Sequence, residues 1–211
     1  MRYYNADGGE AEMCGNGARC FGNFAAALLH HDKTAPLPFE TMAGVVTATF
    51  EKDGNVTVNL TNPHSMQLFV LNADPTVGAD VHFLNTGVPH AVAFLDKLED
   101  LNISRLGAYL RYHEAFSPKG TNANFARILS PGHIAIRTYE RGVEDETLAC
   151  GTGITACALL HAVLTDAPSP IQVDVAGGDT LKVGFQRTGD RFTDVTLTGP
   201  ADLVFTGDIQ I

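Results

Sequence analysis

The most constraining feature of this sequence is a motif that occurs twice. Residues 14–17 (Cys-Gly-Asn-Gly) and 150–153 (Cys-Gly-Thr-Gly) share the pattern Cys-Gly-x-Gly, and each opens an apolar run with helical spacing. The two copies lie 136 residues apart in a chain of 211 residues. Self-similarity on this scale predicts two related units, each of which presents one cysteine at the start of a helix.

A cysteine at a helix start has a specific chemistry. The first turn of a helix carries unpaired N–H groups and the positive end of the dipole, which favour the thiolate. Adjacent glycines let another group approach the backbone, and the free N–H groups can hold a carboxylate. We therefore predict that Cys14 and Cys150 are functional thiols and that Cys20 and Cys157 are small core residues.

Two such thiols on opposite sides of one carbon atom can invert a stereocentre. One thiolate removes the α-proton, and the opposite thiol delivers a proton to the other face. The substrate carboxylate, held by both helix starts, takes up the developing negative charge. This chemistry requires no pyridoxal cofactor.

Composition excludes several classes of protein. Lys and Arg number 14 against 24 Asp and Glu, and the net charge of −10 argues against a nucleic-acid partner. Hydrophobic content of 45% is typical of a packed globular chain, and no apolar run is long enough to span a membrane. Because the N-terminus has no apolar signal region, the four cysteines are expected to be free thiols in the cytoplasm. Their spacings do not match zinc sites, so no metal is expected.

The hydrophobic pattern predicts a mixed α/β fold with more strand than helix. Helices are expected over about 14–31 and 151–164, with a shorter one capped by Ser104. A hairpin is expected around Asp53-Gly54, and residues 116–120 are expected to form a loop. Strands are expected over 45–50, 56–60, 81–84, 91–95 and 133–140, followed by three late strands separated by 177–179 and 189–190.

Asn62-Pro63 interrupts the strand pattern and is the predicted boundary between the two units. The first unit is expected to comprise residues 1–63, with about 199–211 returning to it. The second unit is expected to comprise residues 64–198.

Further segments show that the chain resembles the diaminopimelate epimerase family over essentially its whole length. The matching segments are 4–8 (Tyr-Asn-Ala-Asp-Gly), 12–17, 89–92 (Pro-His-Ala-Val), 120–125, 138–142 and 146–153. The resemblance implies interconversion of LL- and meso-2,6-diaminopimelate without a cofactor, for lysine and peptidoglycan precursor synthesis. It also implies two pseudo-symmetric α/β domains, each a curved mixed sheet around a central helix, and a homodimer with the small-molecule substrate in a cleft.

The resemblance implies a role for each matching site residue. Cys14 and Cys150 would be the proton-transfer pair, and Arg141 would hold the distal carboxylate through its planar fork. The other implied substrate-binding residues are Asn5, Gly15, Asn16, Asn122, Glu140, Gly151 and Thr152, with His90 in a supporting position beside the cysteines. Taken by themselves, the residues leave structural roles open: a surface ion pair for Glu140 and Arg141, a strand-end histidine for His90 and a turn for Asn122.

Two departures from the family pattern matter. Val88 stands where many members have a substrate-binding Asn, and Asn85 or Thr86 would have to replace it. Family members also carry several tens of residues before the equivalent of Tyr3, so the first domain is expected to be N-terminally incomplete, with apolar helix surface uncovered.

Other functions stay open from the residues alone. One is a related cofactor-independent racemase or isomerase of the same fold, and another is an inactive fragment or a thiol-redox protein. Arg141 favours a dicarboxylic substrate, because a monocarboxylate needs no distal cation.

Overall fold

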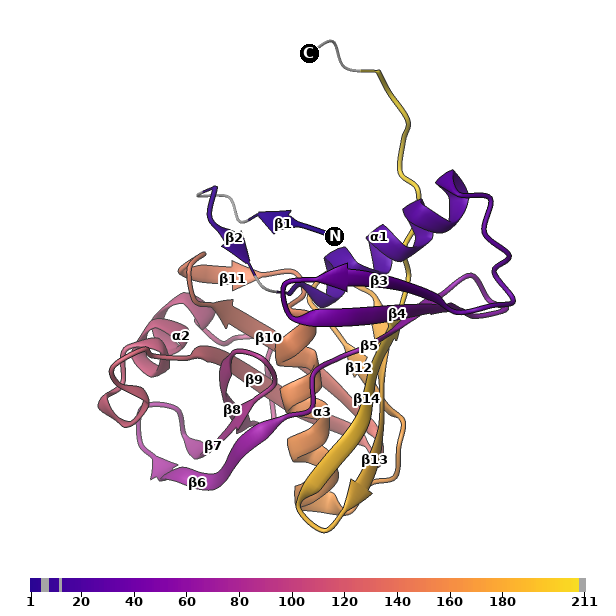
Figure 1. The fold of residues 1–211 in the computed structure, drawn as a ribbon. Coiled ribbons are helices and arrows are strands. Elements are labelled where there is room, and N and C mark those ends of the chain that lie inside the picture. Colours follow the sequence, from indigo (N-terminus) through magenta and orange to yellow (C-terminus); the bar gives the residue numbers. More distant parts are fainter. Residues whose placement is uncertain (5–7, 12, 209–211) are drawn as a thin grey trace.

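The structure is a computed structural model that describes residues 1–4, 8–11 and 13–208. Twelve strands form one mixed sheet in the order β3-β4-β5-β14-β13-β12-β10-β9-β8-β7-β6, with β11 attached to β10 (Figure 1). Neighbouring strands are antiparallel except for the parallel pairs β8–β9 and β10–β12. A separate two-stranded hairpin, β1 (Tyr3–Tyr4) with β2 (Glu10–Ala11), lies near the N-terminus.

The strand bounds locate the sheet in the sequence. They are β3 (Leu37–Thr41), β4 (Gly44–Phe50), β5 (Val56–Asn59), β6 (His64–Asp74), β7 (Ala79–Asn85), β8 (Pro89–Phe94), β9 (Asn122–Ser130), β10 (His133–Glu140), β11 (Asp145–Thr147), β12 (Ile171–Asp174), β13 (Thr180–Thr188) and β14 (Arg191–Gly199). Because β5 pairs with β14, the early strands continue directly into the late strands of the same sheet.

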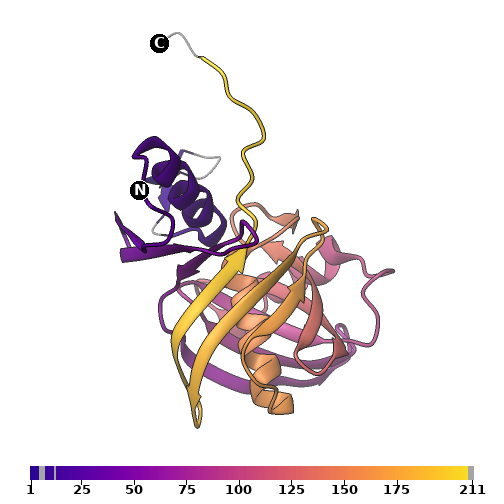
Figure 2. The same cartoon turned by 90° about the vertical axis from the view of Figure 1, so that its right-hand side faces the viewer.

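Helix α3 (Gly151–Thr165) occupies the centre of the molecule, and the sheet curls around it (Figures 1 and 2). The helix contacts strands from both halves of the sheet, including β7 to β10 on one side and β12 to β14 on the other. Its side chains are apolar on nearly every face, as expected for a helix that is enclosed on all sides. This packing forms the larger hydrophobic core, and Cys150, the N-cap residue of α3, is buried.

Helix α1 (Gly15–Leu28) packs against β3, β4 and β5. Its contact face is a stripe of small residues, Ala18, Gly22 and Ala26, which lets the helix lie close to the strands. A Cβ atom on Gly22 would lie 2.6 Å from the Cβ atom of Ala48. The opposite face carries Phe24 and Leu28, which are 61% and 66% exposed. In contrast to α3, α1 is covered by strands on one side.

Helix α2 (Ile103–Arg111) covers the outer face of β9 and β10 and encloses a second hydrophobic core. Gly107 faces Tyr139 of β10 in this contact. Because side chains alternate along a strand, Tyr139 points to α2 while its neighbour Glu140 lies on the other face of β10. The packing of α2 therefore fixes the position of Glu140.

Most predicted elements are confirmed, including the strands over β4, β5, β7, β8, β10 and β12 to β14, and the excess of strand over helix. The α1 helix ends at Leu28, three residues before the predicted end. Phe116, the first residue of the predicted loop, is the last residue of a short 3-10 helix, η1 (Glu114–Phe116). Residues 200–208 form no helix or strand, and Leu203, Val204 and Phe205 are exposed.

The predicted cap of α2 is wrong. Asn102, not Ser104, caps this helix, and its side-chain oxygen accepts a hydrogen bond from the Arg105 N–H at 2.9 Å. The Ser104 hydroxyl instead donates to Asp145 at 2.6 Å, which ties α2 to β11. Asn and Ser are similarly good caps, so tertiary contacts decided which residue took the role.

The pattern analysis missed β6, because this strand does not alternate regularly. Its pairing with β7 shifts register three times, and Ser65, Phe69 and Ala73 have positive φ angles. Each irregularity rotates the following side chains and destroys the period of two.

No helix in the described ranges is both long and apolar enough to cross a membrane.

Replacing Gly107 with Ala tests the close packing of α2. A Cβ atom there would lie 2.2 Å from the Tyr139 Cβ, so Gly107→Ala is expected to lower the free energy of unfolding by about 2 kcal/mol, despite the better helix propensity of Ala. The matched control is Gly177→Ala, whose nearest atoms belong to Leu148 at 3.5 Å, and it should change stability by less than about 0.5 kcal/mol. Urea unfolding measures the free energy of unfolding of both variants. Equal values for Gly107→Ala and the parent protein would contradict the close packing of α2 against Tyr139.

Candidate active site

The N-termini of α1 and α3 meet in the middle of the molecule. A Cβ atom on Gly151 would lie 3.3 Å from the Gly15 Cα, so the two backbones approach closely where both residues are glycine. The Asn16 side-chain amide donates a hydrogen bond to the Ala149 carbonyl at 3.2 Å and links the two helix starts. The duplicated motif thus brings its two copies together.

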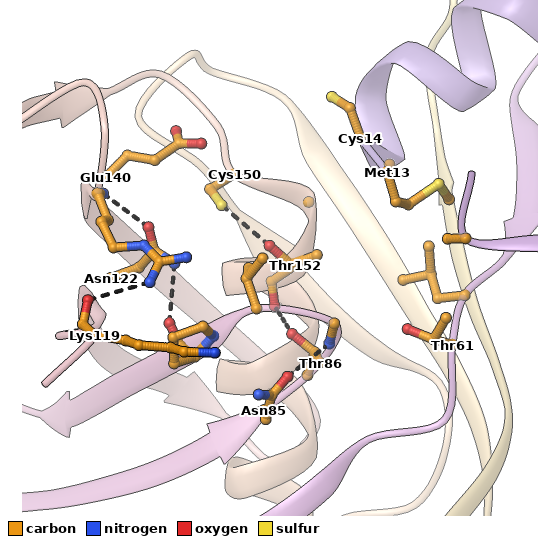
Figure 3. Close-up of a pocket in the computed structure, with 18 of the residues that line it drawn as sticks. Met13, Cys14, Thr61, Asn85, Thr86, Lys119, Asn122, Glu140, Cys150 and Thr152 are labelled. Carbon is orange, nitrogen blue, oxygen red and sulfur yellow. Dashed lines mark hydrogen bonds between the residues drawn. The ribbon is translucent and has the colours of Figure 1, made fainter. Parts of the chain in front are cut away.

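A cavity of about 1100 Å³ opens at this junction. Its walls come from both cysteine motifs, the turn between β7 and β8, the segment after η1 and the end of β10 (Figure 3). The β1–β2 hairpin also contributes to the wall. Most of the predicted site residues line it, namely Cys14, Gly15, Asn16, Asn122, Glu140, Arg141, Cys150, Gly151 and Thr152. Asn5 lies outside the described residues.

Both predicted thiols are helix N-caps in extended backbone conformation, as the motif requires. The Cys14 sulfur is half-buried and accepts a hydrogen bond from the Gly17 N–H at 3.4 Å. The Cys150 side chain is only 7% exposed, and its sulfur lies 3.4 Å from the Thr152 hydroxyl oxygen. All four cysteines are free thiols, as expected.

The surroundings of Cys150 oppose its ionisation. Burial, followed by the nearby Glu140 carboxylate, raises the pKa of Cys150 to about 12. Burial likewise raises the pKa of Glu140. Hydrogen bonds from Thr152 and the Gly153 N–H act in the opposite direction but are weaker. Cys150 is therefore a thiol at neutral pH, with a carboxyl group beside it.

Asn122 and Arg141 are joined at the far wall of the cavity. The Asn122 side-chain oxygen accepts from the Arg141 backbone N–H at 2.8 Å, and its amide nitrogen donates to the Pro89 carbonyl at 2.9 Å. One amide N–H of Asn122 keeps no partner in the part of the chain that the structure describes. The Arg141 guanidinium donates to the Lys119 carbonyl, and the Lys119 side chain also lines the cavity (Figure 3).

His90 is completely buried behind the cavity wall and is not among the residues that line it. Its Nδ1 faces the amide nitrogen of Asn124 at 3.2 Å, which assigns the ring proton to Nε2. Burial, with a smaller effect from Arg141, lowers the pKa of His90 to about 3, so the ring is neutral at pH 7. The buried Nε2 atom has no hydrogen-bond partner among the described residues. His90 thus lies one layer further from the thiols than its sequence position suggests.

The turn between β7 and β8 contains Val88, which stands where the sequence pattern has a substrate-binding Asn. Val88 lines the cavity with an apolar side chain. The Thr86 hydroxyl donates to the Thr152 carbonyl at 2.9 Å and so is bound to α3. The Asn85 oxygen accepts from the Gly87 N–H at 3.0 Å, and its amide nitrogen has no partner among residues 1–4, 8–11 and 13–208. Of the two predicted replacements for Asn, Asn85 keeps the free donor.

One prediction about the other cysteines is confirmed and one is wrong. Cys157 is fully buried in α3, and burial raises its pKa. Cys20, predicted as a core residue, is exposed, because the strands cover only the other side of α1. Helical spacing shows which residues share a face, but it does not show whether that face is covered.

Sequence reasoning missed Tyr3 and Lys119, which both line the cavity. Tyr3 precedes the segment 4–8, and Lys119 precedes the segment 120–125, so proximity to a motif was the only available signal. Among the residues described, no group of three or more His, Cys, Asp or Glu side chains could hold a metal ion.

Comparison with known proteins shows relatives that are similar in sequence and solved structures that are similar in fold. The family model "Diaminopimelate epimerase" matches residues 1–66 and 82–204. Diaminopimelate epimerases from Hydrogenobaculum sp. (strain Y04AAS1) and Aquifex aeolicus (strain VF5) are each 42% identical, over 97% and 99% of this chain and 73% of their own lengths. The crystal structure of a phenazine biosynthesis protein of the PhzF family from Bacillus anthracis aligns with a TM-score of 0.70 at 15% identity, covering 95% of this chain and 76% of that chain.

The Glu140 variant tests the electrostatics of Cys150. Glu140→Gln removes a negative charge that raises the pKa of Cys150, so alkylation of Cys150 by iodoacetamide should begin at lower pH than in the parent protein. Mass spectrometry of the Cys150 peptide across a pH series measures the shift. Glu114→Gln, at an exposed glutamate of η1, is the control and should leave the profile unchanged. If the alkylation profile of Cys150 in Glu140→Gln equals that in the parent protein, the charge of Glu140 does not raise the pKa of Cys150.

Proposed function

The chain belongs to the diaminopimelate epimerase family and is an isomerase, and we propose that it interconverts LL- and meso-2,6-diaminopimelate by a two-cysteine mechanism. The observation that carries the proposal is the junction of two helix N-termini, each with an N-cap cysteine, in the wall of one cavity. No cofactor is needed if two thiols carry out both proton transfers.

The mechanism begins with different protonation states for the two cysteines. The Cys14 thiolate removes the α-proton from one face of the substrate carbon, and the electron pair of the C–H bond becomes the carbanion. The Cys150 thiol, which burial and Glu140 keep protonated, donates its proton to the opposite face. The product has the inverted configuration, and Cys14 is then a thiol and Cys150 a thiolate. After the product leaves, Cys14 releases its proton to solvent and Cys150 takes one up from solvent, which restores the starting state.

The helix starts provide the electrostatic stabilisation. Negative charge develops on the α-carboxylate when the α-proton leaves. The free N–H groups of Gly15 and Asn16 on α1, and of Gly151 and Thr152 on α3, are proposed to hold this carboxylate. These donors are fixed by the helices before the substrate binds, so little reorganisation is needed during the reaction.

Polar groups around the cavity suit the remaining parts of the substrate. Arg141 is proposed to bind the distal carboxylate, and the nearby Lys119 adds positive charge to the same wall. The free amide N–H of Asn122 is a further donor. The buried Asn16 side-chain oxygen, which has no partner in the described ranges, can accept from a substrate ammonium group. Asn85 is proposed to replace the Asn missing at position 88, and Asn5 to contribute as the family motif implies.

Several wider features belong to the same proposal. They include a role in lysine and peptidoglycan precursor synthesis, a cytoplasmic location and a homodimeric state. Two pseudo-symmetric units are also proposed, comprising residues 1–63 with about 199–211, and residues 64–198. The repeated helix starts of α1 and α3 support this division.

Removing either thiol tests the mechanism. Cys14→Ser and Cys150→Ser should each reduce deuterium exchange at the α-carbon of LL-diaminopimelate in D2O by at least about a thousandfold, because a serine hydroxyl is a far weaker acid and base than a thiol. Proton NMR without added cofactor follows both exchange and formation of the meso isomer.

The control for the cysteine variants is Cys157→Ala, on the same helix as Cys150 but buried away from the cavity. It should keep its exchange activity, with a stability loss of about 1 kcal/mol. Near-normal turnover of either serine variant would refute the two-thiol mechanism.

Arg141→Ala tests the distal clamp. Loss of a charge-assisted partner should weaken binding of diaminopimelate by about 2–3 kcal/mol, seen as a rise in KM of roughly thirtyfold or more. Arg105→Ala, at an exposed arginine of α2, is the matched control. A KM equal to that of the parent enzyme would mean that another group binds the distal carboxylate.

A further inference from the structure

The two copies of the Cys-Gly-x-Gly motif differ at the x position, which is Asn16 at α1 and Thr152 at α3. The Asn16 side-chain amide donates to the Ala149 carbonyl at 3.2 Å, so it reaches across to the chain just before Cys150. The Thr152 side chain stays within its own copy, and its hydroxyl oxygen lies 3.4 Å from the Cys150 sulfur (Figure 3). Both x residues therefore act on the same cysteine, one through its backbone and the other through its sulfur.

The position of Thr152 in the helix leaves its hydroxyl free for this contact. A threonine inside a helix often bonds back to the carbonyl four residues earlier. Thr155 and Thr165 of α3 do so, at 2.9 and 2.8 Å. Thr152 is the second residue of α3, so no helical carbonyl lies four residues before it. Among the described residues, the Cys150 sulfur is the single hydrogen-bond partner of its hydroxyl.

We propose that Thr152 is a positioning residue for proton transfer, whose hydroxyl donates a hydrogen bond to the Cys150 sulfur whenever this sulfur is a thiolate. The contact itself does not depend on the reaction, whereas its part in turnover rests on the proposed epimerase function. A hydroxyl suits this place because it can accept from a thiol and donate to a thiolate. The hydrogen bond can therefore persist while Cys150 gives up its proton and regains it.

Thr152 is held in place by the turn between β7 and β8. The Thr86 hydroxyl, which is almost completely buried, donates to the Thr152 carbonyl at 2.9 Å (Figure 3). This bond ties the turn to the first turn of α3 and fixes the backbone from which the Thr152 side chain leaves. The hydroxyl is thus placed beside the sulfur before any substrate binds, and it needs little reorganisation when negative charge develops there.

The charged groups around Cys150 oppose its ionisation, which makes a donor to the sulfur important. Burial, then Glu140 of β10 and more weakly Cys14, raise the pKa of Cys150, whereas the Thr152 hydrogen bond lowers it. His90 of β8 lies against the same helical turn but is neutral at pH 7. The other titratable groups around this place are Tyr3 of β1, Cys157 of α3 itself, and Lys119 and Arg141 in the cavity wall.

The test compares two substitutions of Thr152. Thr152→Val removes the hydroxyl and keeps the branched shape and the backbone N–H, whereas Thr152→Ser keeps the hydroxyl. The rate of Cys150 alkylation by iodoacetamide is measured at several pH values by mass spectrometry of the Cys150 peptide. Thr152→Val is expected to react roughly tenfold more slowly than the parent at each pH, because loss of a hydrogen bond to the thiolate lowers the thiolate fraction. Thr152→Ser should react at the parent rate.

The matched control is Thr165→Val, which removes a hydroxyl from the other end of the same helix. That hydroxyl bonds to the His161 carbonyl and does not contact a cysteine. Thr165→Val should therefore leave the alkylation rate of Cys150 unchanged. A slower reaction in this control would show that the loss of any α3 hydroxyl alters Cys150, and would overturn the assignment of Thr152.

Formation of the meso isomer from LL-diaminopimelate gives the second readout. Thr152→Val should lower kcat by a factor similar to the loss in alkylation rate, with little change in KM, because the backbone N–H proposed to hold the carboxylate remains. A parent-like alkylation rate in Thr152→Val, or an equally slow rate in Thr152→Ser, would overturn the assignment. Slower alkylation of Thr152→Val without isomerisation by the parent protein would support the Thr152–Cys150 contact and reject the epimerase function instead.

Discussion

The contact between the N-termini of α1 and α3 is the constraint on which the rest of the site depends. Two helix starts repel each other electrostatically, because both carry the positive end of a dipole. Here they are held together by the glycine contact between residues 15 and 151, the Leu197 side chain packed against both, and the hydrogen bond from Asn16 to Ala149. The result is a concentrated set of free N–H donors that suits a bound carboxylate.

The enclosure of α3 and the partial cover of α1 make this site asymmetric. The sheet surrounds α3, so Cys150 lies in a dry environment beside Glu140 and behaves as a thiol. Strands cover α1 on one side, so Cys14 is more accessible, and its sulfur accepts a hydrogen bond from the Gly17 N–H. The two copies of the motif therefore differ in packing: Cys150 is buried beside Glu140, whereas Cys14 is half-buried.

A buried polar layer supports the cavity wall from behind. Asn124 is fully buried, donates to the Ala91 carbonyl and to His90, and accepts from the Thr138 hydroxyl. A Cβ atom on Gly153 would lie 2.4 Å from the Asn124 side-chain oxygen, so this layer also requires the second glycine of the repeated motif. The two glycines of the motif at α3 therefore have different roles. Gly151 leaves room for the N-terminus of α1, and Gly153 leaves room for the Asn124 side chain.

Local spacing and the free N–H groups of a first helical turn are enough to predict the repeated helix starts, the N-cap cysteines and most strands. Whether Cys20 is exposed and whether His90 lines the cavity or lies behind it depend on the tertiary structure. Those outcomes depend on which strands cover which helix face. The strands that cover α1 lie between residues 37 and 59, and His90 is enclosed by its contact with Asn124 of the neighbouring strand β9, so the spacing within one element predicts neither outcome.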